Sequence, residues 1–466
     1  MGVLFALTFC NAWRQGNGSP DESSFGAILC KSNIRFNILA IHNANAQLPD
    51  IQQGYLALGA NLRSLRLEPY VHRNGQFMIQ RESHHPLDPV NIPVASSIVS
   101  NGSSDLRYSA TKAWLDDCTQ NHSHCQRLTT GTQNLSLPIR LIQVRLSEDP
   151  VLILMQLVVS EPRLRYATRS HRWCNAANMT LLLKQNLLEL QKGTPIAELP
   201  KKYRDSMEMC RRLGIRYLWI DSLCLIQDDA ADCEKEIANM GNIYKIAYLN
   251  LAATDAANFP DRGLYYESDC DGKLPFHVPV HRQGLTMDYL AYPDKAVSVP
   301  GSSVLMSRGW VLQERMLSSR TVFFDDVLGW ECHTVLANEI FPRSTARFQP
   351  YLGPGVSQKL PRFLDLQDLS ELGAECKKTK LYRRWRQVCV EFSGCELTYC
   401  ADALAAISGL ARDFRRVLND AYLAGIWQND LILSLLWYVG LRFRPSKHNH
   451  EKPRPTVYIG ESLSHQ

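Results

Sequence analysis

Short apolar segments alternate with amphipathic segments through the middle of the chain. The apolar segments are rich in β-branched and aromatic residues and predict strands at Leu137–Val144, Val151–Val159, Leu164–Ser170, Tyr217–Ile226 and Ile246–Ala253. Helical periodicity separates the last three of them, at Met179–Gln191, Tyr203–Leu213 and Asp232–Ile246. Strands joined by amphipathic helices predict right-handed crossovers, a mostly parallel sheet and therefore an α/β domain.

The flanking sequence differs in composition from this central part. A strand pair at Arg320–Asp325 and Leu328–His333 predicts a hairpin, and helical periodicity returns at Leu381–Phe392, Asp402–Val417 and Ile426–Gly440. We therefore expect five segments: an irregular lead-in at 1–130, the α/β domain at 131–345, a linker at 346–380, a mainly helical region at 381–440 and a polar tail at 441–466.

Composition excludes several classes of protein. The chain of 466 residues carries 51 Lys and Arg against 46 Asp and Glu, a net charge of +5 without a dense basic stripe, so we expect no nucleic-acid partner. Its longest apolar run, Val151–Ser160, is the length of a strand, so we expect no membrane span. The N-terminus lacks the basic start of a secretory signal, and we expect a cytoplasmic location with reduced cysteines.

Four metal-ligating residue types lie close together near the end of the lead-in, namely Cys118, His122, His124 and Cys125. Their separations do not match a Cys2His2 finger, in which about a dozen residues divide the two ligand pairs. We therefore expect a helix end with two buried thiols, no metal site and no bound cofactor.

Polar residues follow two of the predicted strands. Ligands of α/β proteins collect beyond the carboxyl ends of parallel strands, so Ser170, Arg172 and Trp173 after one strand are candidate substrate-binding residues. Asp221 is predicted inside the next, apolar strand, where a carboxylate needs a partner. A structural ion pair with Arg169, Arg172 or Arg308 and a role in substrate binding both remain open.

A glutamate lies on the apolar face of the helix predicted after that strand. At about 100° per residue, Glu236 falls among Ile237, Met240 and Tyr244, whereas the opposite face carries Glu234, Lys235, Asn239, Asn242 and Lys245. Asp229 or Asp232 is expected to cap this helix. An inward carboxylate near a strand end is a candidate general acid or base, although a capping or arginine-paired role is the alternative.

The segment Ser307–Arg320 predicts a further short helix with arginines around it. Arg308 is a candidate substrate-binding residue because a guanidinium binds phosphate bidentately. We expect Trp310, Gln313, Glu314 and Arg315 to have structural or interaction roles. Glycine-rich nucleotide loops, nucleophile elbows and HExxH motifs are absent from the sequence.

Three separated blocks resemble one known family. They are YATRSHRWC, the long stretch from LPKKYRDSMEMC to YLNLAAT, and RGWVLQERMLSSRTVFF followed by GWEC. Together, over about residues 137–341, they resemble the heterokaryon incompatibility (HET) domain of filamentous fungi. The resemblance implies a role in fungal self/non-self recognition as a cell-death effector. It also implies a fold similar to the flavodoxin-like TIR domain.

The same resemblance implies a chemistry. Several TIR domains cleave NAD at its glycosidic bond with one glutamate at the start of a helix, and the corresponding stretch here, DCEKE, assigns that role to Glu236. NAD is then a substrate and not a resident cofactor. The chain departs from the family's pattern at Arg169, His171, Cys174 and Cys233, where leucine, tyrosine, glycine and tryptophan are usual.

Two alternatives to an enzyme follow. One is a non-enzymatic signalling module that oligomerises through the predicted helix at Trp310–Leu317, with a structural Glu236. The other is a degenerate, inactive copy of the domain. In every case the expected partners are other incompatibility proteins or a second copy of the chain.

Overall fold

The computed structural model describes the chain in two compact units, Met1–Leu106 with Glu267–Ser298 and Arg107–Tyr266 with Val299–Gln466. The described residues are 104–130, 135–144, 164–173, 180–254, 262–265, 303–325, 327–339 and 373–442, with strands at 36–37, 78–81, 151–154, 276–282, 285–293 and 454–459. In the first unit they form an antiparallel sheet of β1 (Phe36–Asn37), β2 (Met78–Arg81), β8 (Phe276–Arg282) and β9 (Leu285–Pro293).

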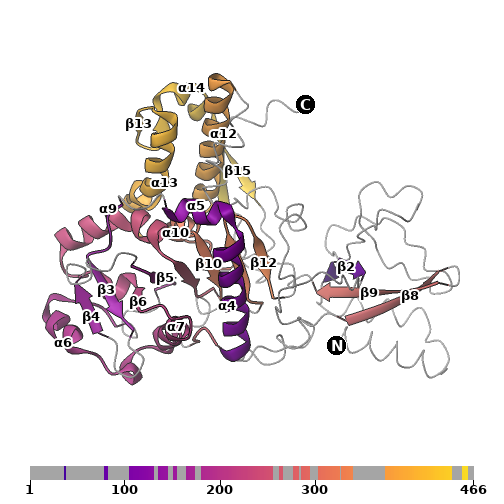
Figure 1. The fold of residues 1–466 in the computed structure, drawn as a ribbon. Helices are drawn as coiled ribbons and strands as arrows, with labels where there is room; N and C mark the ends of the chain where they lie inside the picture. The colour runs from indigo at the N-terminus through magenta and orange to yellow at the C-terminus, as the bar shows by residue number, and fades with distance from the viewer. Residues whose placement is uncertain are drawn as a thin grey trace. The chain divides into compact units, whose positions relative to one another are not determined.

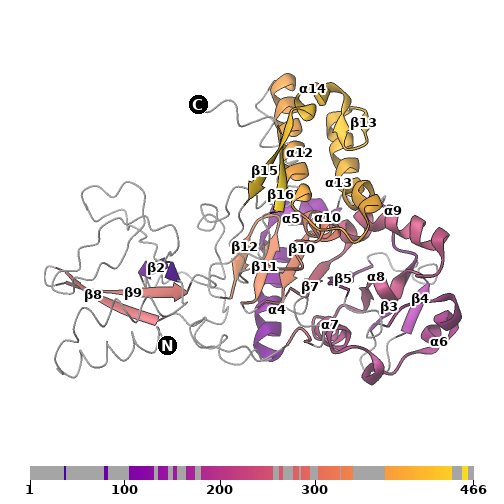
Figure 2. The same cartoon turned by 180° about the vertical axis from the view of Figure 1, so that it is seen from behind.

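An eight-stranded sheet organises the second unit (Figures 1 and 2). Its strands are β3 (Arg140–Gln143), β4 (Val151–Leu154), β5 (Tyr166–Ser170), β6 (Tyr217–Trp219), β7 (Leu249–Ala252), β10 (Arg320–Phe323), β11 (Gly329–Cys332) and β12 (Leu336–Asn338). They are arranged in the order β12-β11-β10-β7-β5-β6-β3-β4. The repeated β–α pattern of the sequence therefore correctly predicts the α/β class.

The sheet is mixed, which corrects the expectation of a mostly parallel one. The central strands β10, β7, β5 and β6 are mutually parallel, whereas β3, β4, β11 and β12 add antiparallel pairs at both edges. The β10–β11 hairpin was predicted, and its short connection requires antiparallel pairing because a parallel crossover needs a dozen or more residues. The short connection between β3 and β4 has the same consequence.

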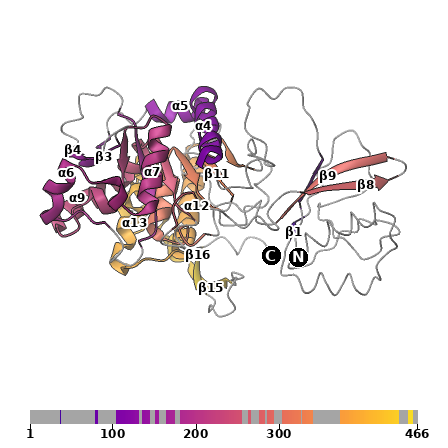
Figure 3. The same cartoon turned by 90° about the horizontal axis from the view of Figure 1, so that it is seen from below.

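Helices cover both faces of the sheet. Their bounds are α4 (Ser104–Asn121), α5 (Ser123–Thr130), α6 (Leu187–Lys192), α7 (Lys201–Arg212), α8 (Asp221–Cys224), α9 (Ala230–Ile246), α10 (Gly309–Leu317), α12 (Ala374–Ser393), α13 (Ala403–Leu418) and α14 (Leu431–Leu435). Figure 3 shows α4 and α7 on one side of the sheet and α13 on the other. On the first side the Arg212 guanidinium lies 4.2 Å from the Tyr108 ring centroid, which joins α7 to α4.

Two glycines allow α9 and α13 to approach closely on the second side. A Cβ atom built on Gly241 would lie 2.8 Å from the Cα of Gly409, and one on Gly409 would lie 2.8 Å from the Cα of Gly241. The Gln313 side chain of α10 accepts a hydrogen bond of 2.7 Å from the Gly409 backbone N–H. The helices α9, α10 and α13 therefore form one tightly packed layer.

The predicted helix at Ile426–Gly440 is wrong. The structure has a short strand β14 (Ile426–Trp427), the helix α14 and a strand β15 (Trp437–Arg442) that pairs with β16 (Arg454–Ile459). Gly425, with a φ of 108°, turns the chain into β14, and the buried Trp427 packs on Trp385. The aromatic and β-branched composition of β15 favours a strand over a helix.

Other helices extend into segments that the sequence assigned differently. α4 and α5 occupy residues 104–130 of the predicted irregular lead-in, and α12 begins at Ala374 inside the predicted linker. Strand β6 ends at Trp219, so Asp221 begins α8 and does not lie within a strand. The Asp221 carboxylate accepts a 2.8 Å hydrogen bond from the Ser222 N–H, which helps to start the helix.

Candidate functional site

The carboxyl ends of the four parallel strands meet at one edge of the sheet. Ser170, the last residue of β5, is paired with Ala252 of β7, and Thr168 is paired with Trp219 of β6. Residues after β5 and β6 therefore come together: the Trp173 indole N–H donates to Asp221 Oδ2 over 2.8 Å. The partner expected for Asp221 is thus present, and its hydrogen-bond donor is an indole instead of an arginine.

Side chains of β5 alternate between the two faces of the sheet, as a strand requires. Thr168 and Ser170 face the α9–α10 side, where both hydroxyls meet the Asn250 side chain of β7 at 3.0–3.2 Å. Arg169 faces α7, with its guanidinium 5.1 Å from the Tyr203 ring centroid. Ser170 is therefore directed to the same side of the sheet as α10.

Glu314 of α10 is buried beside this strand end. Burial raises the pKa of the Glu314 carboxyl to about 7, while interactions with the Ser170 and Tyr244 hydroxyls and with Arg308 oppose the rise and the negative charge of Asp221 adds to it. The sequence assigned Glu314 a structural or interaction role. In the structure it joins Ser170 and Asp221, which were predicted to bind substrate.

The two candidate arginines lie at the margin of this group. Arg308 is half-buried, immediately precedes α10 and interacts electrostatically with both Asp221 and Glu314. Arg172 is exposed and adjacent in sequence to Trp173, whose side chain is 37% exposed. These cationic and aromatic side chains are the accessible part of the group, whereas Glu314 and Ser170 are buried.

A second set of polar residues lies on the α7 side of the same strand ends. The Tyr203 hydroxyl contacts Ser222 Oγ at 2.7 Å and His171 Nε2 at 3.3 Å, and His171 Nδ1 lies 3.6 Å from Asp221 Oδ1. Burial and the nearby cations Arg169, Lys202 and Arg308 hold the pKa of His171 well below its ordinary value. His171 Nδ1 has no hydrogen-bond partner among the described residues, so its contact with Asp221 is not a hydrogen bond.

Arg169 is fully buried next to this set, and its three guanidinium nitrogens have no hydrogen-bond partner among the described residues. Burial lowers the pKa of Arg169 to about 10, opposed by Asp221 and Tyr203. An unpaired buried cation is costly. This chain incurs that cost beside Asp221.

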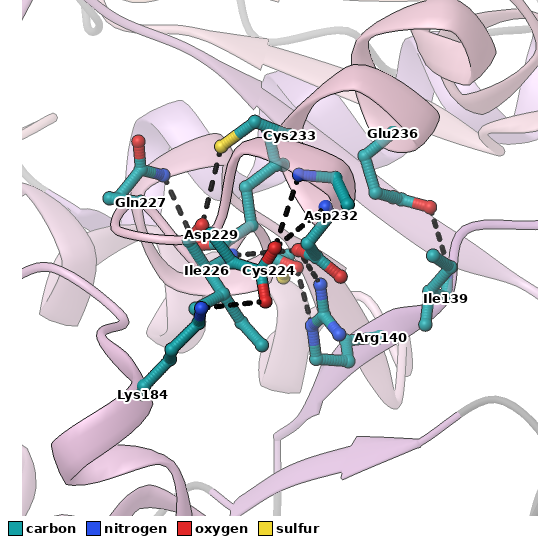
Figure 4. Close-up of polar contacts among 12 residues, drawn as sticks. Ile139, Arg140, Lys184, Cys224, Ile226, Gln227, Asp229, Asp232, Cys233 and Glu236 are labelled. Carbon is teal, nitrogen blue, oxygen red and sulfur yellow. Dashed lines mark hydrogen bonds and ion pairs between the residues drawn. The ribbon is translucent and has the colours of Figure 1, made fainter.

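Glu236 lies in a different polar network (Figure 4). It is 1% exposed, which confirms its inward orientation, and its Oε1 accepts a 3.1 Å hydrogen bond from the Ile139 N–H at the start of β3. Burial raises the pKa of Glu236 to about 7, partly offset by that bond and by Arg140. The described hydrogen bonds and ion pairs of Glu236 include none of Ser170, Trp173 or Asp221.

The surroundings of Glu236 are occupied by structural contacts. Arg140 donates to the Cys224 carbonyl at 2.7 Å and pairs with Asp232, whose carboxylate also accepts from the Ile226 N–H (Figure 4). Asp229 is the helix cap, accepting from the second and third N–H groups that follow it at 3.1 and 3.3 Å. The prediction that one of these two aspartates caps the helix is confirmed.

The other residues of the Ser307–Arg320 segment make contacts within the chain. Trp310 donates to Asp402 at 3.3 Å, Gln313 accepts from Gly409, and Arg315 forms two hydrogen bonds with Glu331 at 2.8 and 3.2 Å. All of α10 except Trp310 is buried. The alternative in which this helix provides an oligomerising surface gains no support, because α9 and α13 already pack against it.

Of the two cysteines noted as departures, Cys233 lies on α9 and not in the strand-end group. Cys233 is half-buried and donates from its thiol to the Ile226 carbonyl at 3.2 Å, and Cys174 falls outside the described residues. Sequence reasoning missed Tyr203, Asn250 and Tyr244, and it gave Glu314 a structural or interaction role without placing it beside Ser170. A glutamate among Val311, Leu312 and Met316 carries the same signal that identified Glu236, a carboxylate in an apolar helix.

Comparison with known proteins gives one family match. Residues 166–314 match the family model described as heterokaryon incompatibility protein (HET). No curated protein and no solved structure matches the chain. Within the described residues, every helix is too short or too polar to cross a membrane.

Proposed function

We propose, from the match of residues 166–314 to the heterokaryon incompatibility family model, that the protein is a cytoplasmic cell-death effector of fungal self/non-self recognition. We propose further that the domain hydrolyses the glycosidic bond of NAD or a related dinucleotide. The observation that supports this activity is the buried Glu314 carboxyl beside Ser170, Asp221 and the exposed Trp173 at the carboxyl edge of the parallel strands.

Glu314 suits the carboxylate role better than Glu236. A pKa of about 7 leaves Glu314 able both to carry charge and to exchange a proton near neutral pH. Its neighbours are groups able to bind a nucleotide: the Trp173 indole offers a stacking surface, and Arg308 and Arg172 offer cations for a pyrophosphate. The pKa of Glu236 is equally raised, but its neighbours hold β3, α8 and α9 together.

The reaction needs little more than charge stabilisation and a water molecule. The bond between the ribose C1′ and the nicotinamide nitrogen breaks, and its electron pair leaves with the ring, which becomes neutral nicotinamide. The Glu314 carboxylate stabilises the positive charge that develops on the ribose. Water then forms a bond to C1′ and loses a proton through Glu314 to solvent, giving ADP-ribose.

The test is an assay of nicotinamide release by the purified full-length protein. We expect release by the wild type, loss of release in Glu314→Gln and wild-type release in Glu339→Gln. Glu339 is a matched control because it is also buried with a pKa raised to about 7, but it accepts from Leu328 at the β12 end of the sheet. A folded wild-type protein that releases no nicotinamide would rule out the activity.

The cell-death role is tested separately by expressing the full chain in a fungal host. Growth arrest that depends on Glu314 supports an enzymatic effector, and growth arrest that persists in Glu314→Gln supports a non-enzymatic one. A folded, harmless chain would contradict both and identify an inactive copy.

One observation favours the non-enzymatic candidate. The short helix α14 exposes Leu431, Ile432, Leu433 and Leu435, with Ile432 79% exposed. Adjacent exposed apolar side chains are typical of contact surfaces. If the chain self-associates through α14, Ile432→Glu is expected to lower the molar mass measured by light scattering and to abolish growth arrest. Ser434→Glu, at a buried position of the same helix, is the control for local unfolding.

A further inference from the structure

Three thiols and an imidazole from distant parts of the chain converge beside the sheet. The donor atoms of Cys118, His122, Cys125 and Cys332 all lie within 4.8 Å of one another. Cys332 Sγ is 3.4 Å from His122 Nδ1, although the two residues are 210 positions apart in the chain. We propose that these four residues form a structural zinc site.

The distances suit a tetrahedral ion. With Zn–S bonds of about 2.3 Å and a Zn–N bond of about 2.0 Å, the ligand atoms of a tetrahedral site are separated by roughly 3.5 to 3.8 Å. The observed separations match this geometry at the Cys332–His122 pair and require movements of about 1 Å or less elsewhere. The Cys3His ligand set is one that structural zinc sites use.

The local fold presents the ligands of the lead-in on one side. Cys118 lies in the last turn of α4, His122 is the single residue between α4 and α5, and Cys125 lies in the first turn of α5. The break between the two helices therefore directs all three side chains to Cys332 at the end of β11. The sequence spacing did not match a zinc finger, and it could not indicate this site because the fourth ligand, Cys332, comes from a remote strand.

The surrounding groups are those expected around a metal–thiolate cluster. Asp117 lies 3.3 Å from His122 Nε2, so the imidazole can donate to a carboxylate while Nδ1 binds the metal. Arg320 donates to Cys118 Sγ at 3.1 Å and the Val335 N–H donates to Cys332 Sγ at 3.2 Å. Both donors stabilise negative charge on sulfur, as three zinc-bound thiolates require.

The site is closed and so has a structural role. All four positions of a tetrahedral ion are taken by protein atoms, three of them from buried residues, which leaves no position for a substrate. The ion would join α4 and α5 to β11, where Trp114 already stacks on Trp330 with ring centroids 6.1 Å apart. A disulfide is a poorer use of this group, because it would consume two of the three sulfurs and leave the third sulfur and His122 Nδ1 without a common ligand, and all three cysteines are free thiols in the structure.

The test is the metal content of the full-length protein, purified through a tag that binds no metal. We expect about one zinc ion per chain by elemental mass spectrometry. After removal of zinc, added Co²⁺ is expected to give thiolate charge-transfer bands and the intense visible bands of a four-coordinate ion. These two measurements need no variant, so they hold even where a ligand substitution prevents folding.

Matched variants sharpen the assignment. Cys332→Ser is expected to lose the zinc, whereas Cys400→Ser, at an exposed cysteine outside the group, is expected to retain it. Asp117→Asn is expected to weaken zinc retention against a chelator about 10- to 100-fold, and the neighbouring Asp116→Asn is expected to leave it unchanged.

Three results would overturn the proposal. They are a folded wild-type protein that binds neither zinc nor cobalt, full zinc retention in Cys332→Ser, and a disulfide between any two of the three cysteines in freshly purified protein.

Discussion

Glu236 and Glu314 are both buried and have the same direction of pKa shift, but the residues around them differ. Both lie on helices of the same face of the sheet, both are buried, and burial raises the pKa of each to about 7. Around Glu236, however, Arg140 is paired with Asp232 and with the Cys224 carbonyl. At the strand ends around Asp221, by contrast, the Arg169 guanidinium on the α7 side of the sheet and Glu314 Oε2 on the other side have no hydrogen-bond partner among the described residues.

This difference shows that burial and a raised pKa do not by themselves identify a functional carboxylate. Structural polar networks satisfy their donors and acceptors, because an unpaired buried group costs about 1–3 kcal/mol. A protein keeps unsatisfied buried groups mainly where a ligand or a reaction uses them. Glu236 Oε2 also lacks a hydrogen-bond partner among the described residues, so the two regions differ in degree: the strand-end region has unsatisfied atoms on Arg169, His171 and Glu314, whereas Glu236 has one.

The largest expected effect separates the two glutamates by activity. Glu314→Gln is expected to lower the rate of nicotinamide release by about 10²- to 10⁴-fold, the range for a lost acid–base or charge-stabilising group. Glu236→Gln is expected to change the rate of nicotinamide release less than about threefold, because Glu236 belongs to a network that does not contact the substrate. Single-turnover kinetics measure both rates, and the reverse ranking would assign catalysis to Glu236.

The next effect concerns the two buried arginines and is measured by urea unfolding. Arg140→Leu is expected to destabilise the protein by about 3 kcal/mol, since it leaves Asp232 and a buried carbonyl unpaired. Arg169→Leu is expected to stabilise it by about 1–3 kcal/mol, because a buried cation without a partner is removed. Destabilisation by Arg169→Leu would mean that Arg169 is paired in the folded protein.

The pH dependence of stability is expected to be the same for both glutamates. A carboxyl whose pKa rises from 4.5 to about 7 on folding destabilises the folded state as pH increases through this interval, and has no effect well below it. As the pH rises from 5 to 8, the free energy of unfolding of each glutamine variant should therefore increase by about 2–3 kcal/mol relative to that of the wild type. A gain confined to one variant would show that the other glutamate is charged and paired.

The smallest effect tests the accessible part of the site. Trp173→Phe removes the indole bond to Asp221 at a partly exposed position, and we expect a stability loss below about 1 kcal/mol. The control Trp310→Phe removes a similar bond to Asp402. Calorimetry compares the two unfolding temperatures, and a raised KM for NAD in Trp173→Phe alone would link Trp173 to the substrate.

Much of the fold follows from local sequence patterns, whereas the contacts between distant residues of the candidate site do not. The strand–helix alternation and the burial of Glu236 depend on residues a few positions apart and were predicted, and Asp229 is one of the two caps that the sequence offered. The segment Ile426–Gly440 was mistaken for one helix because short apolar runs carry no reliable period. The position of Glu314 was missed because its neighbours Ser170 and Asp221 are far from it in sequence.

The sequence by itself determined the α/β class, the residues that turn inward and the chemical types available at the strand ends, because periodicity and capping act over a few residues. Only the tertiary structure decided which of those groups meet: Trp173 with Asp221, Glu314 with Ser170, and Cys332 with His122. The pairing of strands and the packing of helices bring distant segments together, and no local pattern records that choice.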